Sequence, residues 1–143
     1  MVVLAIAYMD GSSIGYKTPN GTFVPHDMSI GKLYKSKDDQ DDYNHVRCTR
    51  TSYRASELDA SLQALKSLNI VNLPHLDQES LSFVGRLDIN DVTLMGHLYG
   101  AASVLILASR KANRGELTSC IAHDPAIDVL PDDASHEIFL SQG

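Results

Sequence analysis

Acidic residues that could bind a divalent cation stand where the pattern of the chain changes. Asp10 follows an apolar run and precedes Gly11 and Ser12, and Glu57 precedes an apolar helical stripe. Carboxylate oxygens are the ligands that Mg²⁺ prefers in proteins. Each residue also has a structural interpretation, because Asp-Gly-Ser is a common turn and an acid in a first helical turn suits the helix dipole.

A second acidic group, the run 38–42, predicts a solvated loop rather than a metal site. Neighbouring side chains in a flexible run do not preorganise a coordination sphere. The chain has six histidines, and five of them show no spacing typical of metal ligands. The sixth, His123, taken alone, is an ordinary loop histidine.

Composition limits the classes of protein to consider. The 143 residues, 43% of them hydrophobic, predict a single domain over 1–143 with its own core. The net charge of −6 gives no overall attraction to nucleic acid or to an anionic membrane, so any phosphate contact needs a local basic patch. Two distant cysteines and the lack of a signal-type or membrane-spanning segment indicate a cytoplasmic location and no membrane partner.

These residues must be positioned by helices and strands whose periods can be read from the sequence. An apolar run predicts a strand at 2–9, and the turn Pro19-Asn20-Gly21 predicts a hairpin that joins 14–16 to 22–24. Leucines and alanines at helical spacing predict a helix from Ser52 to about Leu68. The remaining expected strands are 28–34, 44–49, 70–73 and 117–122, and the remaining expected helices are 77–87, 91–112 and 132–140. This order favours an α/β fold, a mixed sheet with helices packed on it.

Two segments resemble the ribonuclease H family. Residues 8–15, YMDGSSIG, are similar to its first-strand motif, and residues 49–58, TRTSYRASEL, resemble the turn and Glu-Leu pair that open its first helix. His123 and Asp133 lie ten residues apart, like the family's mobile-loop histidine and last carboxylate. The resemblance implies a five-stranded mixed sheet of order 3-2-1-4-5.

The resemblance also implies a metal-dependent endonuclease that cleaves the RNA strand of RNA/DNA hybrids. Two Mg²⁺ ions, or Mn²⁺, would activate water and stabilise the leaving oxyanion. The implied metal ligands are Asp10, Glu57, Asp77 and Asp133, and His123 would assist catalysis. The third carboxylate is Asp77, twenty residues after Glu57, unless the strand is 80–87, in which case it is Asp88 or Asp91. The implied substrate-binding residues are Gly11, Ser12, Arg50, Ser52 and Arg54, and the implied partner is an RNA/DNA hybrid or a structured RNA.

Two alternatives remain open at this point. One is a catalytically inactive ribonuclease H-like module that binds nucleic acid or protein. The net negative charge and the absence of a Trp-rich basic extension favour it. The other is an unrelated α/β protein, such as a small regulatory or immunity domain, that carries Asp-Gly-Ser by chance.

Overall fold

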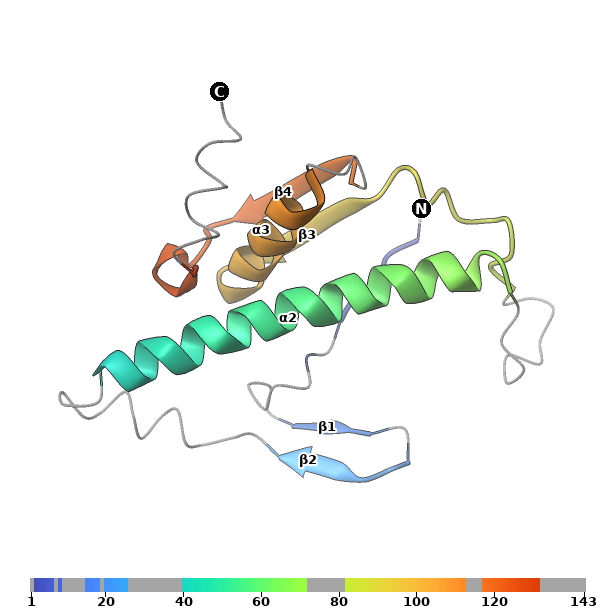
Figure 1. The fold of residues 1–143 in the computed structure, drawn as a ribbon. Helices are drawn as coiled ribbons and strands as arrows, with labels where there is room; N and C mark the ends of the chain where they lie inside the picture. Colours follow the sequence, from blue (N-terminus) through green and yellow to red (C-terminus); the bar gives the residue numbers. More distant parts are fainter. Residues whose placement is uncertain are drawn as a thin grey trace.

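The computed structural model of the chain describes residues 2–6, 8, 15–18, 20–25, 40–71, 82–112 and 117–131. Within these ranges the elements follow one another as two strands, a long helix, and then a strand, helix and strand (Figure 1). They are β1 (Gly15–Lys17), β2 (Phe23–Pro25), α2 (Gln40–Leu68), β3 (Thr93–His97), α3 (Tyr99–Ala112) and β4 (Ser119–His123), followed by the short 3-10 helix η2 (Ile127–Val129).

The β1–β2 hairpin confirms the turn prediction. The strands are antiparallel, with Tyr16 opposite Val24. The amide of Gly21 donates to the Thr18 carbonyl over 2.8 Å, and Gly21 has a φ of 86°, which glycine adopts without strain. The hairpin contacts no other element of the described ranges, and Figure 1 shows it apart from the helices.

The helix α2 is longer than the sequence predicted. Its predicted end at Leu68 is confirmed, but it begins at Gln40, so the predicted strand 44–49 is wrong. The reason is that the inward stripe of Thr51, Ala55 and Leu58 continues backward through Arg47 at the same spacing. Hydroxyl groups that would otherwise favour an extended chain donate to carbonyls one turn earlier, as Thr51 does to Arg47 over 2.8 Å.

A two-stranded parallel sheet lies on one side of α3 and α2 on the other. β3 and β4 pair in register, from Thr93 opposite Ser119 to His97 opposite His123. The helix α3 contacts both strands and α2, whereas α2 contacts neither strand in the described ranges. The crossover from β3 through α3 to β4 is the usual way to join parallel strands.

The core lies where α3 meets its neighbours. Val104, Ile106 and Leu107 are almost fully buried, and each stabilises the fold by about 1.5–3 kcal/mol relative to an exposed side chain. Leu58 of α2 and Leu94 of β3 complete the cluster from the two sides. Val129, at the end of η2, closes it.

This arrangement corrects the predicted fold class. The described chain holds two separate sheets of two strands each, not a five-stranded mixed sheet of order 3-2-1-4-5. The predicted helix 91–112 is wrong over its first turns, because β3 occupies Thr93–His97. Residues 84–87, predicted as helical, form turns, whereas the predicted last strand is confirmed as β4. Residues 70 and 71 form a turn rather than the start of the predicted strand 70–73. The rest of that strand, the predicted strand 28–34, the predicted helix 132–140 and part of 77–87 lie outside the described residues.

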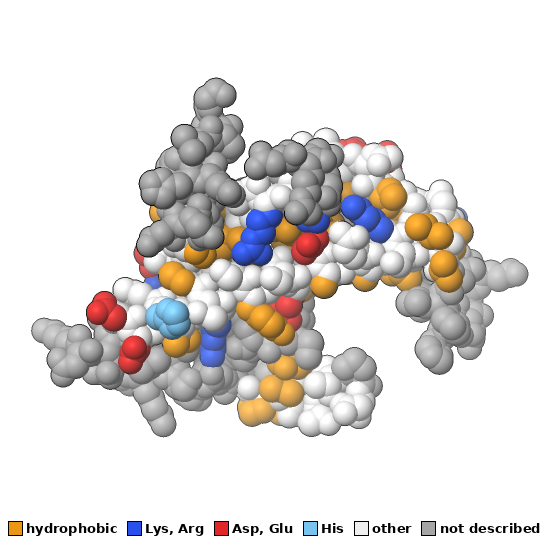
Figure 2. Space-filling view, viewed as in Figure 1, with side chains coloured by type: hydrophobic (Ala, Val, Ile, Leu, Met, Phe, Trp, Pro, Cys, Tyr) orange, Lys and Arg blue, Asp and Glu red, His pale blue; other side chains and the backbone are white. Residues whose placement is uncertain are grey.

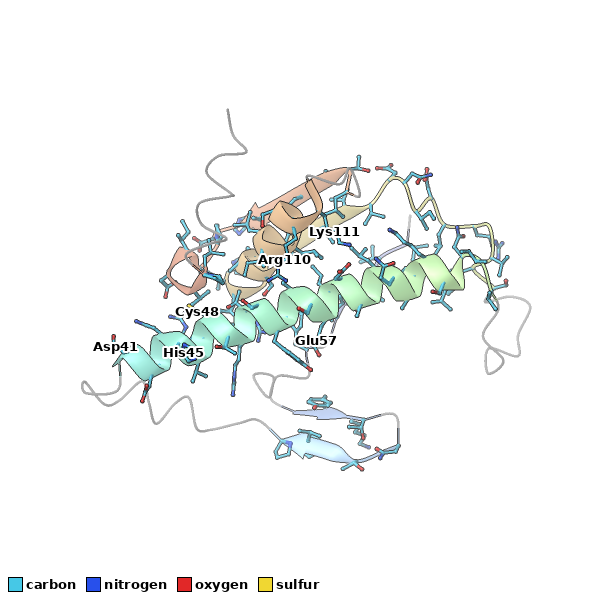
Figure 3. The ribbon with its side chains drawn as sticks, viewed as in Figure 1. Asp41, His45, Cys48, Glu57, Arg110 and Lys111 are labelled. Atoms are coloured by element: carbon cyan, nitrogen blue, oxygen red, sulfur yellow. The ribbon has the colours of Figure 1, made fainter. Side chains whose placement is uncertain are left out.

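A partly buried ion pair joins α2 to the end of α3. Lys111 is only 6% exposed, and its Nζ atom lies 2.9 Å from Oδ1 of Asp59. Figure 3 labels Lys111 near the end of α3, and in Figure 2 basic side chains and an acidic one lie along the upper border of α2. The hydrogen bond from Lys111 lowers the pKa of the Asp59 carboxyl below its ordinary value of 3.8, although desolvation opposes it.

Replacing Asp59 by Asn should make unfolding less sensitive to acid. Because the folded-state pKa of Asp59 is lowered, the pair stabilises the fold above the unfolded pKa and loses this contribution as pH falls through the folded pKa. Thermal unfolding followed by circular dichroism from about pH 6 to about pH 2.5 should show a smaller fall in Tm for Asp59→Asn than for wild type. Asp91→Asn, at an exposed turn, is the control, and equal slopes for wild type and Asp59→Asn would contradict the prediction.

Gly96 should be irreplaceable at the junction of β3 and α3. A Cβ atom there would clash with the carbonyl group of Gly100, since it would lie 2.5 Å from the carbonyl carbon. We expect Gly96→Ala to destabilise the fold by about 1–3 kcal/mol. A Cβ atom at Gly100 would meet nothing within 4 Å, so Gly100→Ala should be neutral or stabilising by up to about 1 kcal/mol. Urea unfolding of both variants measures the difference, and equal losses would refute this account.

Candidate functional site

The junction between β3 and α3 is a one-residue turn at Leu98. The strand ends at His97, the helix begins at Tyr99, and Leu98 has a φ of 50°. A positive φ is uncommon for a residue with a branched side chain and costs of order 1 kcal/mol or more. Such a conformation persists only where the surrounding structure holds it, and at functional sites it often serves to present a side chain.

Backbone hydrogen bonds hold Leu98 in this conformation. Its amide donates to the His123 carbonyl over 3.0 Å, at the end of the neighbouring strand. Its carbonyl accepts from Ala102 in the first turns of α3 and from Ala126 after β4, each over 3.2 Å. The turn is therefore tied to strand, helix and the segment that follows β4.

The turn has the spacing of a nucleophile elbow. In α/β-hydrolases the motif Gly-x-Ser-x-Gly places a serine on a strained strand-to-helix turn, where its hydroxyl is exposed at the top of the sheet. Here the residues are Gly96, His97, Leu98, Tyr99 and Gly100, and Leu98 is 47% exposed. The spacing of the glycines, the strand-to-helix turn and the positive φ match the motif, but the central residue is leucine.

Side chains that could handle protons end the two strands beside this turn. His97 and His123 are register partners, and their ring centroids are 5.1 Å apart. Asp124 follows β4 as Leu98 follows β3, and it too has a positive φ, of 47°. The carboxyl ends of parallel strands are the usual place for ligand sites in α/β proteins.

An open depression adjoins the turn. Its volume is about 410 Å³, and its lining consists of Met95, Gly96, His97, Ile121 and His123. Met95 and Ile121 are paired across the strands and are largely exposed. A small apolar surface therefore lies next to the two imidazoles, as small-molecule sites commonly require.

The residue after the turn is held by α2. The Tyr99 hydroxyl donates to the Arg47 carbonyl over 2.5 Å. The Arg54 guanidinium lies 4.4 Å from the centre of the Tyr99 ring and 4.7 Å from that of Tyr8. Arg47 in turn binds Asp128 of η2 over 2.5 Å. These cation–π and ionic contacts fix the start of α3 relative to α2.

Several of the residues predicted from the sequence lie outside the described ranges. Those residues are Asp10, Gly11, Ser12, Asp77 and Asp133. Their predicted metal-binding, catalytic or substrate-binding roles, and with them the Mg²⁺ or Mn²⁺ site, therefore stay predictions.

Four of the predicted residues that are described lie on one helix, and the fifth lies on a strand. Glu57, Arg50, Ser52 and Arg54 belong to α2, whereas His123 ends β4. Glu57 lies in the middle of the helix rather than in its first turn, and Figure 3 labels it there. Arg54 is 8% exposed and stacked between aromatic rings, so it does not present its charge to solvent.

The remaining candidates have local structural partners. Asp88, an alternative third carboxylate, accepts from the Asn90 amide over 3.1 Å in an exposed turn that also contains Asp91. In the described part of the chain no three His, Cys, Asp or Glu side chains are placed to bind a metal ion. Partial burial raises the pKa of the Cys120 thiol, which lowers its reactivity as a nucleophile.

The sequence analysis included His123 among its predicted residues but did not include Gly96, His97, Leu98, Gly100 or Asp124. The signal was present, because two glycines four residues apart interrupt the apolar segment 91–112. A glycine at each of these positions is unfavourable within one helix and typical of a strand-to-helix elbow. The apolar composition of the whole segment concealed this interruption.

Comparison with known proteins places the chain in a different family from the one its motifs resemble. A family model described as platelet-activating factor acetylhydrolase, isoform II, matches residues 1–137. No curated protein and no solved structure matches the chain. Among the described residues, no helix has the length and apolarity needed to cross a membrane.

The family match overturns the ribonuclease H resemblance and what it implied. The prediction that the chain cleaves RNA/DNA hybrids is wrong, because the matching family consists of acetylhydrolases that act on a lipid. The inactive nucleic-acid-binding alternative and the nucleic-acid partner are likewise without support. The broader prediction of a hydrolase is confirmed at the level of the family.

The match also agrees with the geometry of the site. A strained strand-to-helix turn beside the carboxyl ends of parallel strands is typical of α/β-hydrolase-type enzymes. The family model covers nearly the whole chain, residues 1–137 of 143. This chain therefore belongs to the platelet-activating factor acetylhydrolase isoform II family, a family of hydrolases.

Proposed function

We propose that this chain binds the carboxylic ester of a phospholipid with a short acyl group, at the elbow formed by Gly96, Leu98 and Gly100. The observation that carries the proposal is the positive φ of Leu98 between β3 and α3. In esterases and lipases this conformation presents one residue to the reacting ester, and the amide of the following residue to its carbonyl oxygen. The family match supplies the substrate class.

The surroundings of the elbow suit an ester. The amides of the first turn of α3 have no acceptor within the helix, as at every helix N-terminus, and their positive potential favours a carbonyl oxygen. Met95 and Ile121 offer an apolar surface of the depression to hydrocarbon. His97 and His123 lie at the ends of the same two strands and can donate hydrogen bonds to polar atoms of the ligand.

Binding can be tested with platelet-activating factor and its deacetylated form, each below its critical micelle concentration. We expect calorimetry to give a Kd for the acetyl form that is lower by about tenfold, which corresponds to about 1.4 kcal/mol. Because a side chain at Gly100 would enter open space, Gly100→Leu should block the elbow without disturbing the fold. Ser56→Leu, on an exposed part of α2, is the matched control. Equal affinity for the two lipids, or full binding by Gly100→Leu, would refute the proposal.

A second candidate function is hydrolysis of the bound ester by water that a histidine activates. The specific observation in its favour is the pair His97 and His123, with ring centroids 5.1 Å apart beside the elbow. An imidazole within hydrogen-bond reach of a water can accept its proton as the water attacks, and such general-base catalysis contributes about 10²–10⁴-fold.

This activity predicts slow turnover of p-nitrophenyl acetate that depends on the pair. His97→Gln and His123→Gln should each lower the rate by about tenfold or more, whereas His45→Gln, on an exposed part of α2, should not. Free imidazole in the buffer should restore part of the lost rate after the rate of the same buffer without protein is subtracted. Rates that are unchanged in both variants would remove this candidate.

A further inference from the structure

We infer that Leu98 occupies the place of the catalytic nucleophile, so that this chain holds an ester at the elbow without forming an acyl-enzyme there. The identity of the ligand rests on the proposed function, but the inference about position 98 rests on the backbone alone. The two can therefore fail separately.

The backbone conformation identifies position 98 as the position of the nucleophile in an elbow. Leu98 is the residue between the last residue of β3 and the first of α3, and its φ of 50° is the strained conformation of an elbow. The close approach of Gly96 to the backbone of Gly100 permits this turn, since a Cβ atom at Gly96 would clash. The side chain at 98 is consequently directed away from the packed junction and is 47% exposed.

The side chain of Leu98 cannot attack an ester. Attack on an ester carbonyl needs an atom with a lone pair that can lose a proton, as serine, cysteine or threonine provides. The leucine side chain has only carbon and hydrogen. It can contact the hydrocarbon part of a bound acyl group, but it cannot form a bond to the carbonyl carbon.

The other hydroxyl and thiol groups near this site do not take over the position. Ser103 is fully buried in α3 and donates to the Tyr99 carbonyl over 3.2 Å. Thr93 and Ser119 bind each other over 2.6 Å at the opposite end of the two strands. Cys120 lies on β4, three residues before the end of that strand. Within the described ranges, therefore, the elbow holds leucine, and none of these hydroxyl or thiol groups occupies its position.

Restoring a nucleophile at position 98 tests the inference. In Leu98→Cys, the thiolate should attack p-nitrophenyl acetate so that a C–S bond forms, the ester C–O bond breaks, p-nitrophenolate leaves and the thiol proton passes to solvent. Ser56→Cys adds the same thiol at an exposed site on α2, and both variants keep Cys48 and Cys120. We expect a stoichiometric burst of p-nitrophenolate that is at least about tenfold faster for Leu98→Cys, because the elbow orients the thiol.

A second variant uses a different chemistry. In Leu98→Ser, the hydroxyl oxygen should bond to the phosphorus of a fluorophosphonate while the P–F bond breaks, fluoride leaves and the hydroxyl proton passes to a histidine or to water. Intact mass spectrometry should find one added phosphonyl group in Leu98→Ser and none in the wild type, which already contains the exposed Ser56 as an internal control. Circular dichroism confirms that each variant is folded, which is expected because Leu98 is half-exposed and not part of the core.

The outcomes separate the two proposals. Phosphonylation of the wild type would overturn the inference, because another residue would then be the nucleophile. Folded Leu98 variants that react no faster than Ser56→Cys and take up no phosphonyl group would overturn it as well. Reactive Leu98 variants combined with no lipid binding by the wild type would support the elbow assignment and refute the proposed ligand.

Discussion

The close contact between Gly96 and the first turn of α3 determines the geometry of the whole β3–α3–β4 unit. A Cβ atom at Gly96 would overlap the Gly100 carbonyl group, so only glycine lets the strand and helix backbones meet this closely. The chain must then reverse within one residue, which forces Leu98 into a positive φ. The Leu98 amide, turned toward β4, binds the His123 carbonyl and sets the parallel strands in register. The position of the helix, the pairing of the strands and the exposed side chain at 98 are thus consequences of one contact.

The helix α2 contacts both ends of α3. At the start of α3, Tyr99 donates a hydrogen bond to α2 and stacks on Arg54. At the other end, the buried Lys111 forms an ion pair with the half-buried Asp59. A buried ammonium is costly to desolvate unless it is paired, so Lys111 gives the α2–α3 contact a defined register as well as stability. The apolar residues between these two anchors, such as Val104 and Leu107, belong to the hydrophobic core.

Local features of the sequence predicted local structure well. The hairpin followed from Asn20-Gly21, and β4 and the end of α2 followed from short patterns that depend on near neighbours. Two errors have a common cause, namely that a period alone does not set an element boundary. Residues 44–49 are helical because α2 extends an inward stripe, and residues 93–97 form a strand because Gly96 must meet Gly100. Both facts concern tertiary contacts that a reading of nearest neighbours cannot supply.

The resemblance to ribonuclease H failed for a related reason. Asp-Gly-Ser and a Glu-Leu pair are short combinations that many turns and helices use, so their order along the chain does not specify a fold. In the structure, Glu57 follows several helical turns of α2 and does not open a helix. The elbow, by contrast, could have been predicted, because Gly96 and Gly100 each lie two residues from Leu98, as the glycines do in Gly-x-Ser-x-Gly. The strand before it alternates, with Leu94 buried and Met95 exposed.

Leucine at the elbow raises the question of why the strained turn persists without a hydroxyl to present. The answer lies in packing, because the positive φ is required by the junction whatever side chain stands there. Relaxing it would break the Leu98–His123 and Leu98–Ala126 hydrogen bonds and move the start of α3 off Leu94 and Leu58. The strain of order 1 kcal/mol is small beside that loss. The turn that forms the candidate site therefore also supports the core, and a substitution at position 98 can change the chemistry while the fold stays the same.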